Sequence, residues 1–195
     1  MSSLEETRAF FAPRAATWDE RFPDDAPAFA RAVKELDLSI GSCVLDVGCG
    51  TGRAFEVLRA GVGPTGHVVG LDVTPEMLHV AARHTAAPLV LADARYLCFG
   101  AATVDGVFAA GLLPHLPDPV DGLAELARVV RPRGRLALFH PIGRAALAAR
   151  HERSLRPDDA LDPRVLPGLL RATGWEPLFV DDAADRYLAV AQRAR

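Results

Sequence analysis

The sequence is poor in lysine and in long apolar runs, and both shortages exclude classes of protein. Lys34 is the only lysine, and the 195 residues carry a formal net charge of −3. This balance gives no basic footprint for nucleic acid, and the many arginines are dispersed along the chain. No apolar run approaches the ~20 residues that a membrane helix needs. We therefore expect no nucleic-acid partner and no membrane span.

Cysteine is also scarce, and its placement argues against disulfides and metal. Cys43, Cys49 and Cys98 form neither an even set nor a C-x-x-C pair, so we expect reduced thiols and no metal site. The first residues, MSSLEETRAFF, lack the positive start and apolar core of a signal peptide. The expected location is cytoplasmic.

What the chain does have is enough apolar material for a full core. Its hydrophobic fraction is 50%, which argues against disorder, and 195 residues suffice for one ordinary domain. We expect a single domain over residues 1–195. Within it, residues 1–40 would form a helical cap and residues 41–195 an α/β core.

The stretch CVLDVGCGTGR at 43–53 is typical of a buried strand that enters a tight loop and then a helix. Gly48, Gly50 and Gly52 stand at alternate positions, so the backbone could take positive φ and approach a ligand closely. The helix that follows would present unpaired N–H donors. A nucleotide-type ligand is indicated.

Two residues bear on which nucleotide fits. Arg53 occupies the place of the last glycine in the dinucleotide pattern G-x-G-x-x-G, and Asp46 lies two residues before the loop. A carboxylate there would repel a pyrophosphate and attract a cationic ligand. S-adenosyl-L-methionine carries a sulfonium and an ammonium group and no phosphate, so it fits this description. A nicotinamide-dependent oxidoreductase is the less favoured alternative.

The segment VLDVGCGTG resembles the first motif of class I S-adenosylmethionine-dependent methyltransferases, in particular their type 11-like members that act on small molecules. The segments GLDVTPEML, LADARYL and VFAAGLLPHLPDP, followed by LARVVRPRGRLAL, are similar to the next blocks of that family, in the right order. The resemblance implies an α/β fold with a Rossmann-like, doubly wound sheet of seven strands. The sheet would be mostly parallel with one antiparallel strand, the last, inserted between the fifth and sixth, and helices would cover both faces.

Three positions, Asp72, Asp93 and Ala94, are expected to contact the nucleoside part of the cofactor. Asp72 ends the strand expected over 67–72, 20 residues after Gly52, close to the interval at which a carboxylate reaches ribose hydroxyls. It could also cap the helix that Thr74 and Pro75 begin. The resemblance implies that Asp93 accepts from the adenine amine and that the backbone N–H of Ala94 binds the ring; a turn role for Asp93 is the alternative.

The remaining cofactor contacts are implied by the resemblance. Trp18 would lie in N-terminal helices expected over 4–18 and 28–36, which either close the cleft or only pack on the domain. Met77 would contact adenine or simply fill the core, and Gly111 and Leu112 would border the methyl group. The full expected set is Trp18, Asp46, Gly48, Cys49, Gly50, Thr51, Gly52, Asp72, Val73, Met77, Asp93, Ala94, Gly111, Leu112 and His115.

Two histidines are candidate catalytic residues. His115 follows Pro114 in a loop where relatives often carry two histidines, and His140 ends the strand expected from Arg135. Both belong to the carboxyl edge of the sheet, where ligands of open α/β folds bind. A hydrogen-bonded structural role is the alternative for each.

The predicted function is transfer of a methyl group from S-adenosyl-L-methionine to a small-molecule acceptor by in-line displacement, with S-adenosyl-L-homocysteine as the product. The donor is already activated, so alignment of the reactants supplies much of the catalysis, and a general base is needed only if the acceptor loses a proton. The alternative is a non-catalytic S-adenosylmethionine-binding or regulatory protein on the same fold.

Overall fold

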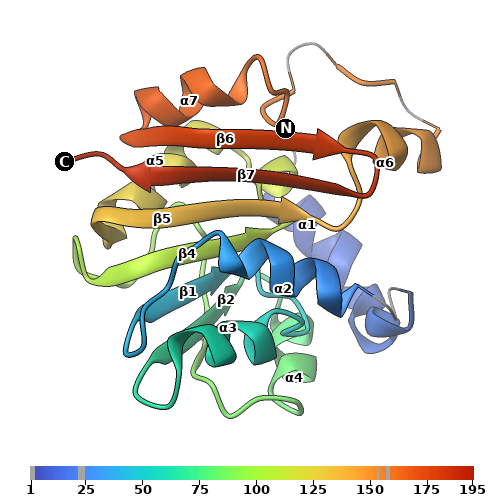
Figure 1. Ribbon diagram of the computed structural model, residues 1–195. Coiled ribbons are helices and arrows are strands. Elements are labelled where there is room, and N and C mark those ends of the chain that lie inside the picture. Colours follow the sequence, from blue (N-terminus) through green and yellow to red (C-terminus); the bar gives the residue numbers. More distant parts are fainter. Residues whose placement is uncertain (1–2, 22–24, 153, 157–158) are drawn as a thin grey trace.

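The computed structural model describes residues 3–21, 25–152, 154–156 and 159–195, and its centre is a seven-stranded sheet in the order β3-β2-β1-β4-β5-β7-β6 (Figure 1). The first five strands pair in parallel, and β7 pairs antiparallel with both β5 and β6. The expected sheet, with its last strand between the fifth and sixth, is confirmed. The strands are β1 Cys43–Val47, β2 His67–Asp72, β3 Leu89–Leu91, β4 Val104–Ala110, β5 Val130–His140, β6 Trp175–Ala183 and β7 Arg186–Arg193.

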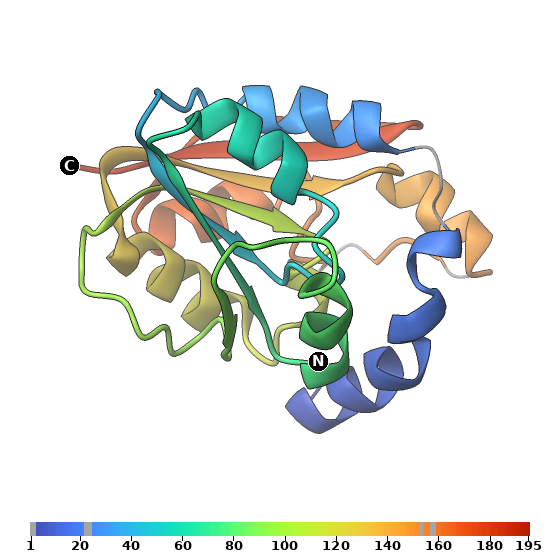
Figure 2. The same cartoon turned by 90° about the horizontal axis from the view of Figure 1, so that it is seen from below.

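Helices cover both faces of the sheet, which explains why its central strands are apolar on both sides. Figure 2 shows α2 (Ala26–Lys34) and α3 (Phe55–Val62) on one face and α5 (Pro119–Val129) and α7 (Leu166–Ala172) on the other. Each face has its own buried cluster of apolar side chains. Among the described helices the longest has 11 residues, and none is long and apolar enough to cross a membrane.

The N-terminal segment lies against the carboxyl edge of the sheet. It consists of α1 (Leu4–Phe11) and two short 3-10 helices, η1 (Ala12–Thr17) and η2 (Asp19–Arg21). Figure 2 shows this segment beside α4 (Pro75–Ala81), and η1 contacts that helix. The Nε of Arg8 donates to the carbonyl of Val73 at 2.8 Å, just beyond the end of β2. The segment therefore covers the edge at which the parallel strands end.

The expected helix over 4–18 is wrong in its second half. A capping box between Ser3 and Glu6 starts α1 as an α-helix, but α1 ends at Phe11 and the chain continues as η1. Pro13 has no N–H to donate to the preceding turn, so the α-helical bonding pattern cannot run through it. After this break, Asp19 of η2 accepts a hydrogen bond from Thr51 of the glycine loop.

The boundary between α5 and β5 also differs from the expectation. The sequence predicts a helix to Pro132 and a strand from Arg135, whereas α5 ends at Val129 and β5 begins at Val130. Val130 pairs with Val104 of β4, and this pairing extends the strand backwards over the Pro-Gly segment. The other expected boundaries differ from those observed by a few residues.

Candidate functional site

The loop after β1 turns sharply between that strand and α3. The N–H groups of Gly48 and Cys49 both donate to the carbonyl of Leu71 on β2, at 2.8 and 2.9 Å. Gly52 has φ +90°, and a Cβ there would lie 2.5 Å from the ring of Phe55. Only glycine fits this position, because its φ is positive and a side chain there would overlap the ring of Phe55.

Asp46 is buried at this edge, and no cationic side chain in the part of the chain that the structure describes offsets its charge. Its side chain is 1% exposed, and among the described residues its Oδ2 has no hydrogen-bond partner. Burial, with a smaller contribution from the nearby Asp72, raises the pKa of Asp46 to about 8. A buried carboxylate with an unused oxygen favours a cationic ligand, because the cation would offset the cost of burying the charge. The site therefore fits S-adenosylmethionine and disfavours a pyrophosphate.

Asp72 ties the glycine loop to the start of α4. Its Oδ2 accepts from the N–H of Gly50 at 2.9 Å, and its Oδ1 accepts from the N–H of Thr74 at 2.8 Å. Burial raises the pKa of Asp72, although these backbone bonds oppose the shift. Thr74 is the N-cap residue of α4, but its hydroxyl makes no capping bond, and Asp72 binds the N–H of Thr74 just before the first turn. Each oxygen of Asp72 keeps a lone pair for a ribose hydroxyl, so this structural role and the ribose role are compatible.

Asp93 and Ala94 follow β3 on the far side of Asp72. Asp93 forms a fork with Arg95, whose Nη2 lies 2.7 Å from Oδ2. Burial acts to raise the pKa of Asp93, but the hydrogen bonds from Arg95 outweigh it and hold the pKa below its ordinary value. The carboxylate of Asp93 is thus ionised, and some of its acceptor capacity is taken by Arg95. Ala94 is buried beside it, as is Met77 on α4, near Gly50.

His115 lies at the end of β4, past Gly111 and Leu112, in the short helix η3 (Leu113–His115). Its ring is half-buried and meets the ring of Phe11 edge-on, with centroids 4.9 Å apart. Burial, and secondly His140, lower the pKa of His115. The ring is neutral at pH 7 and faces the N-terminal segment.

His140 ends β5 beside His115. Its Nδ1 lies 2.8 Å from the carbonyl oxygen and 3.1 Å from the amide nitrogen of Ile142. The carbonyl oxygen can only accept from Nδ1 and the amide N–H can only donate to it, so the two contacts correspond to opposite tautomers of the neutral ring. Burial lowers the pKa of His140, so the neutral form prevails at pH 7. The two histidines predicted from the sequence are thus brought to one edge.

The N-terminal segment closes over the glycine loop through direct bonds. The hydroxyl of Thr51 donates to Oδ1 of Asp19 at 2.6 Å. Trp18 packs edge-on against Phe11, with ring centroids 5.4 Å apart. Cys49 is buried in the loop, and burial raises the pKa of its thiol well above its usual range. All the residues predicted to contact the cofactor lie along this edge or on the segment that covers it.

Sequence reasoning missed three charged residues at this edge. Arg53 forms ion pairs with Asp25 and, at 3.8 Å, with Asp19. Arg53 stood out in the sequence only because it is not a glycine, and nothing in the spacing signalled the two aspartates. Their contacts join segments about 30 residues apart, 28 for Asp25. Only the fold brings them together.

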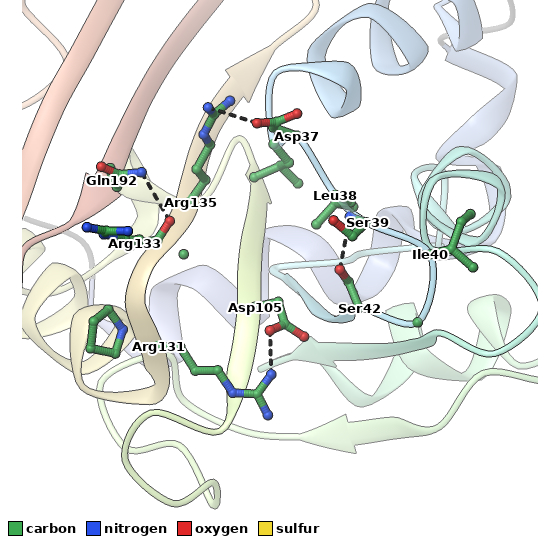
Figure 3. Close-up of a pocket in the computed structure, with 14 residues that line it drawn as sticks. Asp37, Leu38, Ser39, Ile40, Ser42, Asp105, Arg131, Arg133, Arg135 and Gln192 are labelled. Atoms are coloured by element: carbon green, nitrogen blue, oxygen red, sulfur yellow. Dashed lines mark hydrogen bonds and ion pairs between the residues drawn. The ribbon is translucent and has the colours of Figure 1, made fainter.

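A pocket of about 510 Å³ lies at the opposite, amino-terminal edge of the sheet (Figure 3). The loop before β1 and the first residues of β5 form it. Arg135 pairs there with Asp37 at 3.0 Å, and Arg131 pairs with Asp105 (Figure 3). Ligands of open α/β sheets bind outside the carboxyl ends of the strands. The candidate functional site is therefore the edge that carries Asp46, and not this pocket.

The family described as "Methyltransferase domain" matches residues 45–138. An O-methyltransferase, cnsE, from Penicillium expansum is 34% identical over 154 residues, which cover 73% of this chain and 55% of that protein. A demethylmenaquinone methyltransferase from Staphylococcus aureus is 38% identical over 108 residues, covering 53% of this chain and 45% of that one. The structure of a SAM-dependent methyltransferase from Aquifex aeolicus superposes with a TM-score of 0.71, at 22% identity and over the whole of both chains.

The strand order, the glycine loop and these similarities define an α/β methyltransferase fold. The family match over residues 45–138 and the named methyltransferase relatives support a class I S-adenosylmethionine-dependent methyltransferase, and the superposition shows the same fold. The aligned part spans from 32% to 55% of the length of the curated relatives that it matches first.

Proposed function

We propose that this protein transfers a methyl group from S-adenosyl-L-methionine to a small-molecule acceptor. The observation that carries the proposal is the buried Asp46, whose Oδ2 has no partner in the described residues and whose pKa is raised. A group with positive charge and no phosphate is the natural complement to such a carboxylate. The match of residues 45–138 to the methyltransferase-domain family supports the same cofactor.

The chain's own residues would hold the cofactor by its three parts. Asp72 would accept from ribose hydroxyls, and Asp93 with the N–H of Ala94 would take the adenine. The glycine loop, with Asp46 beneath it, would face the cationic end, and Trp18 would cover it. When bound, S-adenosylmethionine supplies an activated methyl group, so alignment by these residues accounts for much of the catalysis, on the order of 7–11 kcal/mol.

The acceptor would lie between Gly111, Leu112 and the two histidines. Both His115 and His140 have lowered pKa values and are neutral at pH 7, so either ring can take a proton from an acceptor hydroxyl. His140 would act as the base in the tautomer whose Nδ1 donates to the carbonyl of Ile142, because Nε2 then carries the lone pair that takes the proton. A base would add about 10²- to 10⁴-fold. The names of relatives, one of them an O-methyltransferase, support a small acceptor.

We further propose that residues 1–195 form one domain. The two apolar clusters lie on opposite faces of the same sheet, and the N-terminal segment is bonded to its edge through Arg8 and Thr51. The segment is therefore the cap of this domain and not a separate unit.

Calorimetric titration tests the cofactor. We expect micromolar binding of S-adenosylmethionine and S-adenosylhomocysteine and no binding of NAD. Binding of NAD alone would contradict the proposal and support an oxidoreductase. Binding of both sulfur compounds, with no production of S-adenosylhomocysteine across a set of phenols, amines and thiols, would instead support a non-catalytic binding protein.

A further inference from the structure

The cavity of about 510 Å³ at the amino-terminal edge of the sheet has walls of mixed charge (Figure 3). Small-molecule sites in proteins usually measure roughly 300–1,000 Å³, so this cavity is large enough to hold a ligand. The segment over residues 36–42, which leads into β1, and the first residues of β5 form most of it. The charged side chains that line it are Arg131, Arg133, Arg135, Asp37 and Asp105. The three arginines outnumber the two aspartates, which favours an anion.

The arginines lie on and beside a bulge of β5. The register between β4 and β5 shifts between Val104 and Gly106. Residues 131–134 of β5 therefore stand opposite Asp105 alone. Bulges re-aim side chains and are common next to active sites. Gly134 is required in this one, because a Cβ would lie 2.5 Å from the carbonyl oxygen of Asp105. The arginine-bearing segment is thus an ordered part of the sheet.

Two of the arginines are held by aspartates from different elements (Figure 3). Arg131 pairs with Asp105 of β4, and Nη2 of Arg135 lies 3.0 Å from Oδ2 of Asp37, in the segment before β1. A guanidinium group has five N–H donors. Both arginines therefore keep donors for a ligand in addition to those that the aspartates use.

The two aspartates differ in how firmly they are bound. Asp105 accepts from Arg131 with one oxygen and from the N–H of Cys43 with the other, at 2.7 Å. Asp37 has a side chain that is 74% exposed and pairs only with Arg135. An exposed ion pair contributes little to stability. An anionic ligand can therefore displace Asp37 from Arg135, whereas Asp105 stays in place.

Arg133 is the arginine without a counter-charge. Its exposed side chain extends from the bulge beside Gln192, whose amide donates to the carbonyl of Arg133 at 3.2 Å (Figure 3). Among the described residues, its guanidinium has neither an ion pair nor a hydrogen-bond partner. Its φ of +69° is unusual for a residue with a side chain, and backbone strain of this kind gathers at ligand sites.

We propose that this cavity binds a phosphate ester, with the phosphate held by Arg133 and Arg135. The phosphate takes the place of Asp37, and the organic part packs against Leu38 and Ile40. A phosphate group presents three terminal oxygens to the guanidinium donors, whereas a carboxylate presents two. Free phosphate would leave most of the cavity unfilled. The site is separate from methyl transfer, so its failure would leave the proposed function untouched.

The experiment titrates the full-length protein with monobutyl phosphate, inorganic phosphate and 1-butanol, followed by ligand-observed NMR. Excess S-adenosylhomocysteine is present, so that the carboxyl-terminal edge is occupied. The wild type is expected to bind the ester more tightly than inorganic phosphate and not to bind the alcohol. Equal affinity for the ester and inorganic phosphate would overturn the ester assignment, and no binding of either would overturn the site.

Four variants locate the binding. Arg133→Gly, which removes the strained side chain, and Arg135→Gln should each bind the ester about tenfold more weakly. Asp37→Asn should bind it more tightly, because it removes the competing carboxylate, and asparagine tolerates the φ of +52° there.

Arg171→Gln removes an exposed arginine of α7, outside the cavity, and is the charge-matched control. It should bind the ester as the wild type does. Equal binding by the wild type, Arg133→Gly and Arg135→Gln would refute the proposed contacts. An equal loss in Arg171→Gln would show that binding follows net charge alone, which would also refute them.

Discussion

Asp46 is the residue whose charge is least compatible with the ligand-free fold. Its pKa rises from 3.8 to about 8 on folding, so between these values the folded protein keeps a proton that the unfolded chain has lost. Its contribution to stability is therefore fully present below pH 3.8 and is lost as the pH rises towards 8, by about 1.4 kcal/mol per pH unit. Asp46→Asn cannot ionise and should escape this loss.

We expect Asp46→Asn to gain stability relative to wild type as the pH rises from 5 to 8, by several kcal/mol in total. Urea unfolding at pH 5, 6.5 and 8 measures the difference, and other titrating groups cancel to a first approximation because both proteins contain them. The same variant should bind S-adenosylmethionine more weakly, because the cationic end of the ligand would no longer face a carboxylate. A constant stability difference across this range would show that Asp46 is ionised throughout.

Asp72 has a structural role and a proposed ribose-binding role, and ligand analogues can separate the two. If Asp72 accepts from the ribose, Asp72→Ala should weaken S-adenosylhomocysteine binding by roughly 1–3 kcal/mol, about 5- to 150-fold. The variant also loses the bonds to Gly50 and Thr74, so its unfolding free energy should fall.

Adenosine and 2′,3′-dideoxyadenosine distinguish the two effects. A disturbed loop weakens both ligands equally, whereas a lost ribose contact weakens adenosine selectively. The affinities are measured by calorimetry. If the wild-type protein binds adenosine and 2′,3′-dideoxyadenosine equally well, Asp72 does not bind the ribose hydroxyls.

At the scale of single residues, the sequence is most informative where a side chain acts close to its own strand end. Asp46 lies near the end of a predicted strand, and Asp72 and Asp93 end predicted strands, so the strand pattern places all three at one edge. Asp25 and Arg53 carry no such signal, because their contact joins the start of α2 to the end of the glycine loop. Pairings of that kind depend on how elements pack and cannot be derived from local pattern.

At the scale of elements, the start of β5 contains a strained residue that can be tested directly. Arg133 has φ +69°, a backbone conformation that costs a non-glycine residue on the order of 1 kcal/mol or more. Its carbonyl accepts from Gln192, a contact that any residue can supply. Arg133→Gly should relieve the strain and raise the unfolding free energy by up to about 1 kcal/mol, after the entropy that glycine adds to the unfolded chain.

Guanidinium unfolding checks this, with Arg131→Gly as the matched control. Arg131 does not have a positive φ and pairs with Asp105, so its replacement should destabilise the protein. A destabilised Arg133→Gly would mean that the arginine side chain stabilises this turn.

Element boundaries were predictable only where local and tertiary preferences agree. β2 was predicted residue for residue, because GVGPTG before it and Thr74-Pro75 after it are turn and helix-start signals. At β5 the local and tertiary preferences disagree. Pro132 and Gly134 favour a turn, whereas pairing with β4 extends the strand across these two residues. For residues 4–18 the local signal, Pro13, was present. The prediction gave more weight to the helix-forming composition of this segment and was therefore wrong.

At the scale of the whole molecule, the order of the strands came from the family resemblance and not from periodicity. Periodicity finds strands but cannot say which are neighbours, and the place of β7 between β5 and β6 is a property of the complete sheet. That sheet joins both apolar clusters, because Val190 of β7 faces one and Ala189 the other. A sheet buried on both faces should unfold in one step.

The two tryptophans report on different parts of the molecule and make this testable. Trp175 is buried and donates to the carbonyl of Leu123 at 2.9 Å, whereas Trp18 lies on the N-terminal segment. We expect the fluorescence transitions of Trp18→Phe, which reports Trp175, and of Trp175→Phe, which reports Trp18, each to coincide with the circular dichroism transition of the same variant. A Trp18 transition at lower denaturant would show that the cap opens before the core.

Ligand binding should then stabilise cap and core together, because the proposed site uses residues of both. At 100 times its dissociation constant, S-adenosylhomocysteine should add about 2.7 kcal/mol to the unfolding free energy. For a chain of this size that corresponds to a rise of roughly 5–10 °C in Tm. If the cap contributes nothing to binding, Trp18 will unfold at the same temperature with and without ligand while Trp175 shifts. A common shift of both signals ties the cap, the glycine loop and the sheet into one binding unit.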